Sequence, residues 1–278
     1  MYDIVTEMPA NLTRGGRVLN LYKRLGETPR ERLERLRGQR HEYETEVLSY
    51  AGRLDPMAEG VLVCLVGSAN KMHDAYLTMN KEYTLDILLG FSTDTYDVLG
   101  RVMGKGDALS IKKKDIEQAL NEFRGAVSQE YPPYSSKTVE GKSLFAWARA
   151  GALGSMVLPR RTVNIYDISL LSTYKIKESQ LLSYIEESVG KVQGDFRQDD
   201  VLRDWRRELS AKGSPTFAQG TGVVEREFPC ATVSISCSSG TYARSIANGV
   251  GEILKCPALA LHILRTKVGE YSVEKSLK

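Results

Sequence analysis

Cysteine, histidine and long apolar runs are scarce in this sequence of 278 residues. The four cysteines form no C-x-x-C pair, and the three histidines are scattered along the chain. This spacing argues against a disulfide scaffold and against a structural zinc site, and it suits a reducing compartment, for which we expect the cytoplasm. No run of about 18 apolar residues is present, so we expect no membrane-spanning helix.

Residues 1–17 lack the pattern of an export signal. They include the acidic Asp3 and Glu7 and no apolar core, so we expect no secretory signal peptide. Hydrophobic residues make up 42% of the chain and charged residues 26%, which is the composition of an ordinary globular protein. The formal net charge of +3 permits a nucleic-acid or phosphate partner without requiring one.

Segments with strand patterns outnumber short helical ones. Residues 83–89, 163–171 and 231–237 are typical of strands, and the last of these alternates apolar and polar side chains. Helical spacing covers residues 243–254, and residues 28–31 form a capping box with proline at the first helical position. Together these patterns predict an α+β fold built on a mixed, mainly antiparallel sheet flanked by helices.

Residues 174–228 follow a different pattern. They contain two amphipathic helical stretches and then a loop rich in Gly, Ser and Thr at 213–222. We therefore predict a helical insertion, in the form of a hairpin, between two strands of the sheet. The second helix carries cations that suit either phosphate contact or a solvated outer face: Arg203, Arg206, Arg207 and Lys212.

Residues 52–56, with the sequence GRLDP, are the first candidate for chemistry. On local physics alone, Asp55 before Pro56 is a turn or N-cap signal. Gly60 and the apolar residues after it predict a chain reversal that leads into a buried segment. This spacing by itself does not identify a nucleophile.

The context of Asp55 changes this interpretation. Further motifs follow it at residues 81–83, 93–97, 131–149, 237–245 and 264–269. Taken together and in this order, they resemble the TruB family of tRNA pseudouridine synthases. The resemblance covers about residues 17–171 and 229–271, which is most of the chain.

The resemblance implies an isomerase that acts on the T arm of tRNA. Members of the family convert the uridine at position fifty-five of the T-loop to pseudouridine. The base is flipped out, detached at N1, turned and rejoined to the ribose through C5. No metal, nucleotide or redox cofactor takes part, and we expect a monomer that needs no guide RNA.

The resemblance assigns catalysis to three residues. Asp55 matches the catalytic aspartate, and an ionised carboxylate is able to add covalently to the substrate or to remove a proton. Arg244 matches the arginine that pairs with this aspartate through its guanidinium fork. Tyr83 matches the tyrosine that stacks on the displaced uracil. Whether Asp55 attacks the ribose, attacks the base or abstracts a proton stays open.

Five further residues are expected to bind or position the substrate. Tyr50 stands five positions before Asp55, where the family usually has histidine. Tyr242 is expected to shape the pocket, and Lys23 and Lys81 suit positioning or phosphate contact. The fifth residue, Lys137, suits contact with the sugar-phosphate backbone.

Residues 131–161 resemble the thumb that closes over the RNA loop in this family. Pro132 and Pro133 stiffen its hinge, and Trp147 suits either stacking on RNA or a place in the core. The residues after Val273 are too few for the RNA-binding PUA domain of many relatives. We therefore expect residues 1–278 to form a single catalytic domain. Besides Lys137, the thumb carries cations suited to phosphate contact: Lys142, Arg149, Arg160 and Arg161.

Other functions fit parts of the pattern. A tRNA-binding or folding module without catalysis is disfavoured by the joint presence of Asp55, Tyr83 and Arg244. A guide-RNA-dependent synthase is disfavoured by the missing PUA-like tail. A glycoside hydrolase needs a pair of carboxylates, and no paired Asp/Glu motif stands out. Pseudouridine synthesis in another RNA remains an alternative within the same chemistry.

Overall fold

A nine-stranded sheet is the centre of the computed structural model, which describes residues 16–210 and 225–278. Two short strands pair with this sheet at its sides, β2 (Leu48–Ala51) with β3 and β13 (Tyr271–Ser272) with β12. All strand pairs are antiparallel except β3 with β12. The predicted α+β class is therefore confirmed. The main path runs β1 (Arg17–Lys23), β3 (Ala58–Val66), β12 (Ala258–Val268), β4 (Lys81–Leu89), β11 (Glu227–Cys237), β10 (Arg160–Lys177) and β7 (Gly125–Glu130).

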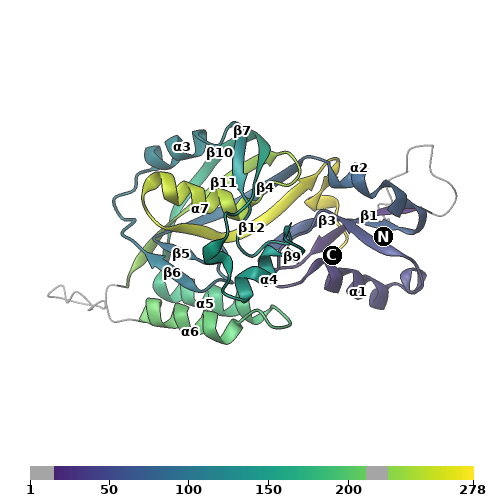
Figure 1. Ribbon diagram of the computed structural model, residues 1–278, viewed down its shortest axis with the longest axis horizontal. Helices are drawn as coiled ribbons and strands as arrows, with labels where there is room; N and C mark the ends of the chain where they lie inside the picture. Colours follow the sequence, from purple (N-terminus) through teal and green to yellow (C-terminus); the bar gives the residue numbers. More distant parts are fainter. Residues whose placement is uncertain (1–15, 211–224) are drawn as a thin grey trace.

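Helices cover both faces of the sheet (Figure 1). On one face, α3 (Lys113–Asn121) and α7 (Ala243–Leu254) pack their apolar sides against alternating residues of β4 and β11. On the other face, α5 (Glu178–Gly190) and α6 (Gln198–Ser210) pack against Leu88 and Leu259. The predicted alternation in β11 is observed, because its apolar residues between 231 and 237 are buried under α3 and α7.

Two further helices lie at the side of the sheet formed by β1 and β3. The helix α1 (Pro29–Gln39) begins at the predicted capping box, in which the Glu31 amide donates to Thr28 Oγ1 at 3.2 Å. Leu33 and Leu36 of α1 pack on β1 and β3. The second helix, α2 (His73–Leu77), precedes β4. Residues 16–210 and 225–278 also contain four 3-10 helices: η1 (His41–Tyr43), η2 (Gly67–Met72), η3 (Leu153–Ser155) and η4 (Val273–Lys275).

Two excursions leave the sheet. Between β7 and β10 the chain forms β8 (Thr138–Val139), β9 (Lys142–Ser143) and α4 (Leu144–Arg149), within the segment predicted as the thumb. Trp147 lies within this segment, where its indole N–H donates to the Val139 carbonyl at 3.0 Å. A second excursion follows β4 as a separate two-stranded sheet, β5 (Phe91–Thr93) and β6 (Val102–Lys105).

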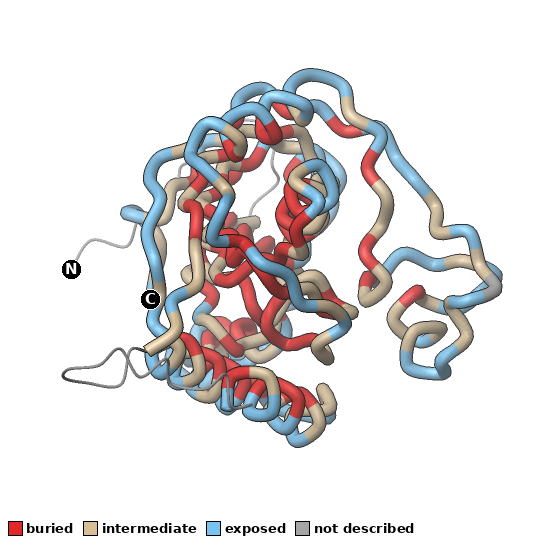
Figure 2. The backbone as a smooth tube through the Cα atoms, turned by 90° about the vertical axis from the view of Figure 1, so that its left-hand side faces the viewer, coloured by how far each residue is buried: buried red, intermediate tan, exposed pale blue. Residues whose placement is uncertain are grey.

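The helical insertion begins later than its predicted start at 174. Strand β10 continues to Lys177, because its last residues pair with β11 as far as Glu227. The hairpin of α5 and α6 follows, and Figure 2 shows this pair at the bottom, buried along one side and exposed along the other. The whole predicted loop at 213–222, and Lys212, lie outside the described residues. Within the described ranges no helix is long and apolar enough to cross a membrane.

Candidate active site

A cleft of about 740 Å³ opens at one end of the sheet. Its volume lies within the usual range for small-ligand sites, which is about 300–1,000 Å³. Residues far apart in the sequence line it, from the β2–β3 loop, β4, the β5–β6 turn, the thumb, the α5–α6 linker and the start of α7. Of the predicted site residues, the cleft brings together Asp55, Lys81, Tyr83, Tyr242 and Arg244.

An ion pair joins Asp55 and Arg244 in this cleft. Asp55 lies in the β2–β3 loop, in a turn closed by the amide of Ala58, which donates to the Asp55 carbonyl at 3.0 Å. Arg244 Nε and Nη2 each lie 2.8 Å from Asp55 Oδ2. The side chain of Arg244 is 3% exposed and that of Asp55 is 28% exposed. The arginine is therefore a buried support, whereas the carboxylate is accessible from the cleft.

A second carboxylate, Asp97, stands beside the same arginine. Its Oδ2 lies 3.6 Å from Arg244 Nε. It accepts hydrogen bonds from Thr95 Oγ1 at 2.6 Å and from the Leu99 amide at 3.0 Å. Burial raises the pKa of Asp97 to about 6, although Arg244 and Thr95 favour the charged form. Arg244 thus lies between two carboxylates that both line the cleft, of which Asp55 is partly exposed and Asp97 is buried.

Backbone carbonyls complete the environment of Arg244. Nη1 donates to the Thr95 carbonyl at 2.5 Å, and Nη2 donates to the Tyr134 carbonyl at 3.2 Å. Every guanidinium nitrogen therefore has an acceptor or a carboxylate neighbour, as a buried charge requires. The orientation of Arg244 depends on the β5–β6 turn and on the base of the thumb.

Tyr83 and Tyr242 supply aromatic surface to the cleft. Tyr83 projects from β4, and burial raises the pKa of its hydroxyl to about 12, so the phenol is neutral at physiological pH. The backbone of Tyr242 is fixed by Gln129, which accepts from the Tyr242 amide at 2.8 Å and donates to its carbonyl at 3.1 Å. Its ring meets that of Tyr131 edge to face at 5.7 Å.

The predicted lysines Lys81 and Lys23 lie in different environments. Lys81 lines the cleft, but its ammonium donates to the carbonyls of Leu77 and Met79 at 2.7 and 2.5 Å, and burial lowers its pKa to about 8. Lys23 does not line the cleft. It is fully buried and donates to the carbonyls of Arg24 and Glu27. Burial lowers the pKa of Lys23 to about 7.

Tyr50 and Lys137 also lie outside the lining of the cleft. Tyr50 is in β2 opposite Cys64, where it packs against the apolar cluster between α1 and the sheet. Lys137 is exposed, with its ammonium 5.6 Å from the centre of the Tyr131 ring. Lys23, Tyr50 and Lys137 therefore do not line the cleft, although the charge of Asp55 acts on the buried Lys23 ammonium. The binding roles of these three residues stay predictions.

Arg265 fixes the loop that carries Asp55 and was not predicted as a site residue. It is 1% exposed, and it donates to the carbonyls of Gly52, Arg53 and Val61 at 3.1, 3.2 and 2.7 Å. Residue 60 must be glycine here, because a Cβ there would lie 2.2 Å from the Arg265 carbonyl and its φ is +107°. Arg265 and Asp97 both belong to motifs of the resemblance, but sequence does not reveal which backbone groups a buried side chain reaches.

Arg161 lies at the wall of the cleft, against the backbone of Gly240. The φ of Gly240 is +80°, which favours glycine, and a Cβ at residue 240 would lie 1.9 Å from Arg161 Nη1 and displace that guanidinium. In the described part of the chain no carboxylate pairs with Arg161 or with Arg53, which also lines the cleft. Both cations are available to an anionic ligand.

The cations of α6 are satisfied within the protein. Arg203 pairs with Asp200 at 2.9 Å, Arg206 with Glu186 at 2.7 Å, and Arg207 with Glu208 at 3.1 Å. All three are more than half exposed. Of the two predicted alternatives, this pairing favours a solvated outer face over a phosphate-binding face.

The feature of the cleft that suits chemistry is the partly exposed carboxylate of Asp55. An ionised group at its wall is held by a buried guanidinium, beside a neutral aromatic ring. Over residues 16–210 and 225–278, no group of three or more His, Cys, Asp or Glu is placed to hold a metal ion. Such a site can stabilise or attack an electron-poor centre in a flat, neutral ring bound beside Tyr83.

Known proteins resemble this chain in sequence and in fold. The family described as "TruB family pseudouridylate synthase (N terminal domain)" matches residues 40–192. tRNA pseudouridine synthase B of Clostridioides difficile (strain 630) is 29% identical over 261 residues, which is 94% of this chain and 68% of that protein. The protein of the same name from Bacillus subtilis (strain 168) is 30% identical over 259 residues, covering 93% and 67%.

A solved structure shares the fold. The crystal structure of a Cbf5-Nop10-Gar1 complex matches with a TM-score of 0.53 and 20% identity. The match covers 93% of this chain and 50% of that chain, so this protein spans about half the length of its structural neighbour.

Proposed function

Because the chain belongs to the TruB family of pseudouridylate synthases, we propose that it isomerises the uridine at position fifty-five in the T arm of tRNA. Asp55 is the catalytic carboxylate in this proposal. The observation that carries it is the partly exposed Asp55 held by the buried Arg244 inside a cleft large enough for one nucleoside. The tRNA substrate is supported by the names of the curated relatives.

The reaction rearranges bonds without adding or removing atoms. The C1′–N1 bond of the uridine breaks and a C1′–C5 bond forms, while C5 loses a proton and N1 gains one. The target base must leave its stack to reach a cleft of this kind. Tyr83 offers the flat surface on which the flipped ring lies, and its hydroxyl remains neutral because burial raises its pKa to about 12.

Arg244 acts on the reaction through Asp55. RNA that closes the cleft removes water from Asp55, and an unpaired carboxylate would then be costly. The Arg244 guanidinium pairs with Asp55 Oδ2 and thereby fixes the orientation of the carboxylate toward the substrate. Attack on the ribose, attack on the base and proton abstraction all require this charged and oriented carboxylate.

The proposal also covers the compartment, the oligomeric state and the domain organisation of the enzyme. The enzyme acts in the cytoplasm as a monomer, with one catalytic domain and a thumb at about 131–161. It needs no guide RNA, and the exposed cations Arg53 and Arg161 at the cleft contact the substrate backbone directly.

The test uses purified protein and an unmodified tRNA transcript without any other RNA. Pseudouridine is mapped by chemical labelling and primer-extension stops. We expect wild type to modify the T-loop uridine, and Asp55→Asn to be slower by at least about 100-fold. The control is Asp167→Asn, because Asp167 is an exposed carboxylate on β10 that lies outside the cleft.

Each outcome decides between the alternatives. Equal rates for wild type and Asp55→Asn would remove Asp55 from the mechanism. Tight binding of tRNA by wild type without any labelling would favour a binding module. Labelling only in a different RNA would retain the chemistry and change the substrate.

A further inference from the structure

The linker between α5 and α6 reaches the catalytic cleft. Asp195, Phe196 and Arg197 line it, although they belong to the helical insertion. The linker is held by its own hydrogen bonds, since the Gln198 side chain donates to the carbonyls of Val192 and Gly194 at 3.0 and 2.7 Å. This wall of the cleft is therefore an ordered part of the hairpin.

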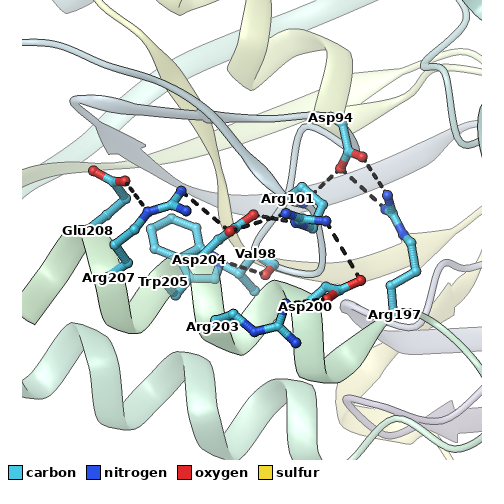
Figure 3. Close-up of polar contacts among 10 residues, drawn as sticks. All are labelled: Asp94, Val98, Arg101, Arg197, Asp200, Arg203, Asp204, Trp205, Arg207 and Glu208. Atoms are coloured by element: carbon cyan, nitrogen blue, oxygen red, sulfur yellow. Dashed lines mark hydrogen bonds and ion pairs between the residues drawn. The ribbon is translucent and has the colours of Figure 1, made fainter. Parts of the chain in front are cut away.

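Arg197 makes two directed contacts from this linker. Nη1 and Nη2 donate to Asp94 Oδ2 and Oδ1 at 2.7 and 3.3 Å, which is a fork-to-fork pair (Figure 3). Its guanidinium carbon also lies 4.4 Å from the centre of the Tyr134 ring. The Arg197 and Asp94 side chains are 23% and 21% exposed, so water screens the pair only in part. One side chain thus ties the β5–β6 turn to the base of the thumb.

These two contacts lie next to the groups that orient Arg244. The carbonyl of Thr95, one residue after Asp94, accepts from Arg244 Nη1. The carbonyl of Tyr134, the residue on whose ring Arg197 lies, accepts from Arg244 Nη2. Arg197 therefore contacts the same two segments whose backbone carbonyls position Arg244.

The hairpin provides a fixed base for Arg197. Arg101 of the β5–β6 turn forms ion pairs with Asp204 and Asp200 of α6 (Figure 3). The indole N–H of the fully buried Trp205 donates to the Val98 carbonyl at 3.1 Å. A displacement of the β5–β6 turn would break these contacts, so the turn and the hairpin form one unit.

We propose that Arg197 is a positioning residue for uridine isomerisation, which acts through Asp94 and Tyr134 on Arg244 and thereby on Asp55. The helical insertion is thus part of the active site. This inference rests on the proposed function. A displacement of about 1 Å in a catalytic group can cost about 100-fold in rate even when the altered residue is remote.

The experiment compares Arg197→Ala with Arg206→Ala. Arg206 is the matched control, because it is an ion-paired arginine of the same hairpin that does not line the cleft. The probe is a T-arm stem-loop RNA, assayed by single turnover and by equilibrium binding well below the melting temperature of each variant. For Arg197→Ala we expect a rate at saturating RNA at least about tenfold lower, with the Kd within about twofold of wild type.

The Arg206→Ala variant should match wild type in rate and Kd. Arg197→Lys should recover only part of the rate, because an ammonium keeps the charge but not the fork. An unchanged rate in Arg197→Ala would overturn the inference. So would a raised Kd with an unchanged rate at saturation, since that pattern identifies a direct RNA contact.

A second measurement separates this inference from the proposed function. Hydrogen exchange of the free protein should be faster in residues 93–100 and 131–149 of Arg197→Ala than of Arg206→Ala. Equal exchange in the two variants would overturn the inference whether or not the protein acts on tRNA. An inactive wild-type protein would overturn the proposed function, and faster exchange in Arg197→Ala would then still show that Arg197 supports the β5–β6 turn and the thumb.

Discussion

Ionisation of the buried Asp97 lowers the stability of the folded protein. Burial raises its pKa from 3.8 to about 6 in the folded protein, so the native state binds this proton more tightly than the unfolded chain does. The stability that Asp97 contributes is therefore fully present below about pH 4 and is lost as the pH rises through about 6. At neutral pH Asp97 nevertheless serves as the second carboxylate beside Arg244.

This titration predicts an acid limb in activity. As the pH falls through about 6, Asp97 becomes neutral and Arg244 loses one of its two anionic neighbours. We expect the single-turnover rate of wild type to fall between about pH 7.5 and about pH 5.5. Asp97→Asn should be slower by about tenfold at the upper pH and nearly flat over this range.

The control for this prediction is Asp167→Asn, in which an exposed carboxylate outside the cleft is replaced. It should keep both the wild-type rate and the inflection. An inflection that persists unchanged in Asp97→Asn would assign the acid limb to another group.

At the scale of secondary-structure elements, the sequence correctly predicted the features that depend only on neighbouring residues. The capping box of α1, the buried alternation of β11 and the helix α7 depend on neighbouring residues, and all are observed. The end of β10 at Lys177 depends on its pairing with β11 about fifty residues later, so the predicted boundary at 174 was early. The local sequence does not distinguish the exposed end of a strand from a loop that precedes a helix.

The same reasoning explains what was missed in the site. The motifs contained Asp97 and Arg265, but their importance follows from contacts with Arg244 and with the Asp55 loop. Arg197 pairs with Asp94 across 103 positions, and no periodicity or spacing indicates such a pair. The resemblance predicted the pair of Asp55 and Arg244, but the residues that support this pair from other elements are known only from the fold.

Trp205 is predicted to be the main apolar anchor of the helical insertion. It is fully buried, lies 5.3 Å from the Phe91 ring and donates to the Val98 carbonyl. Trp205→Ala should lower the free energy of unfolding by about 3–5 kcal/mol, because it leaves a cavity and an unpaired carbonyl. Trp205→Phe should lower it by about 1–2 kcal/mol, mainly through the lost hydrogen bond.

Urea denaturation measures these changes. Arg203→Ala is the control, since Arg203 is an exposed member of an ion pair on the same helix and should change stability by less than about 0.5 kcal/mol. Similar losses for Trp205→Ala and Arg203→Ala would mean that α6 does not pack on the β5–β6 turn in solution.

For the whole molecule, the net charge of +3 conceals an uneven distribution of free cations. In the thumb segment, Arg149 pairs with Asp195 and Arg160 with Glu130. Within the described ranges Lys137, Lys142 and Arg161 have no carboxylate partner. Only unpaired cations release counterions from RNA without first breaking an internal ion pair. The electrostatic part of RNA binding should therefore depend on a few thumb residues.

Salt dependence tests this distribution directly. Each phosphate contact contributes about 0.7–0.9 to the slope of log K against log salt concentration, depending on whether the strand is single or paired. Lys137→Ala and Arg161→Ala should therefore each reduce the slope for T-arm RNA by nearly one unit, whereas Lys113→Ala should not change it. Lys113 is a matched control because it pairs with Glu117 on α3, outside the cleft. If the three variants shared the wild-type slope, RNA would bind a different face of the protein, and the thumb cations would have no phosphate partners.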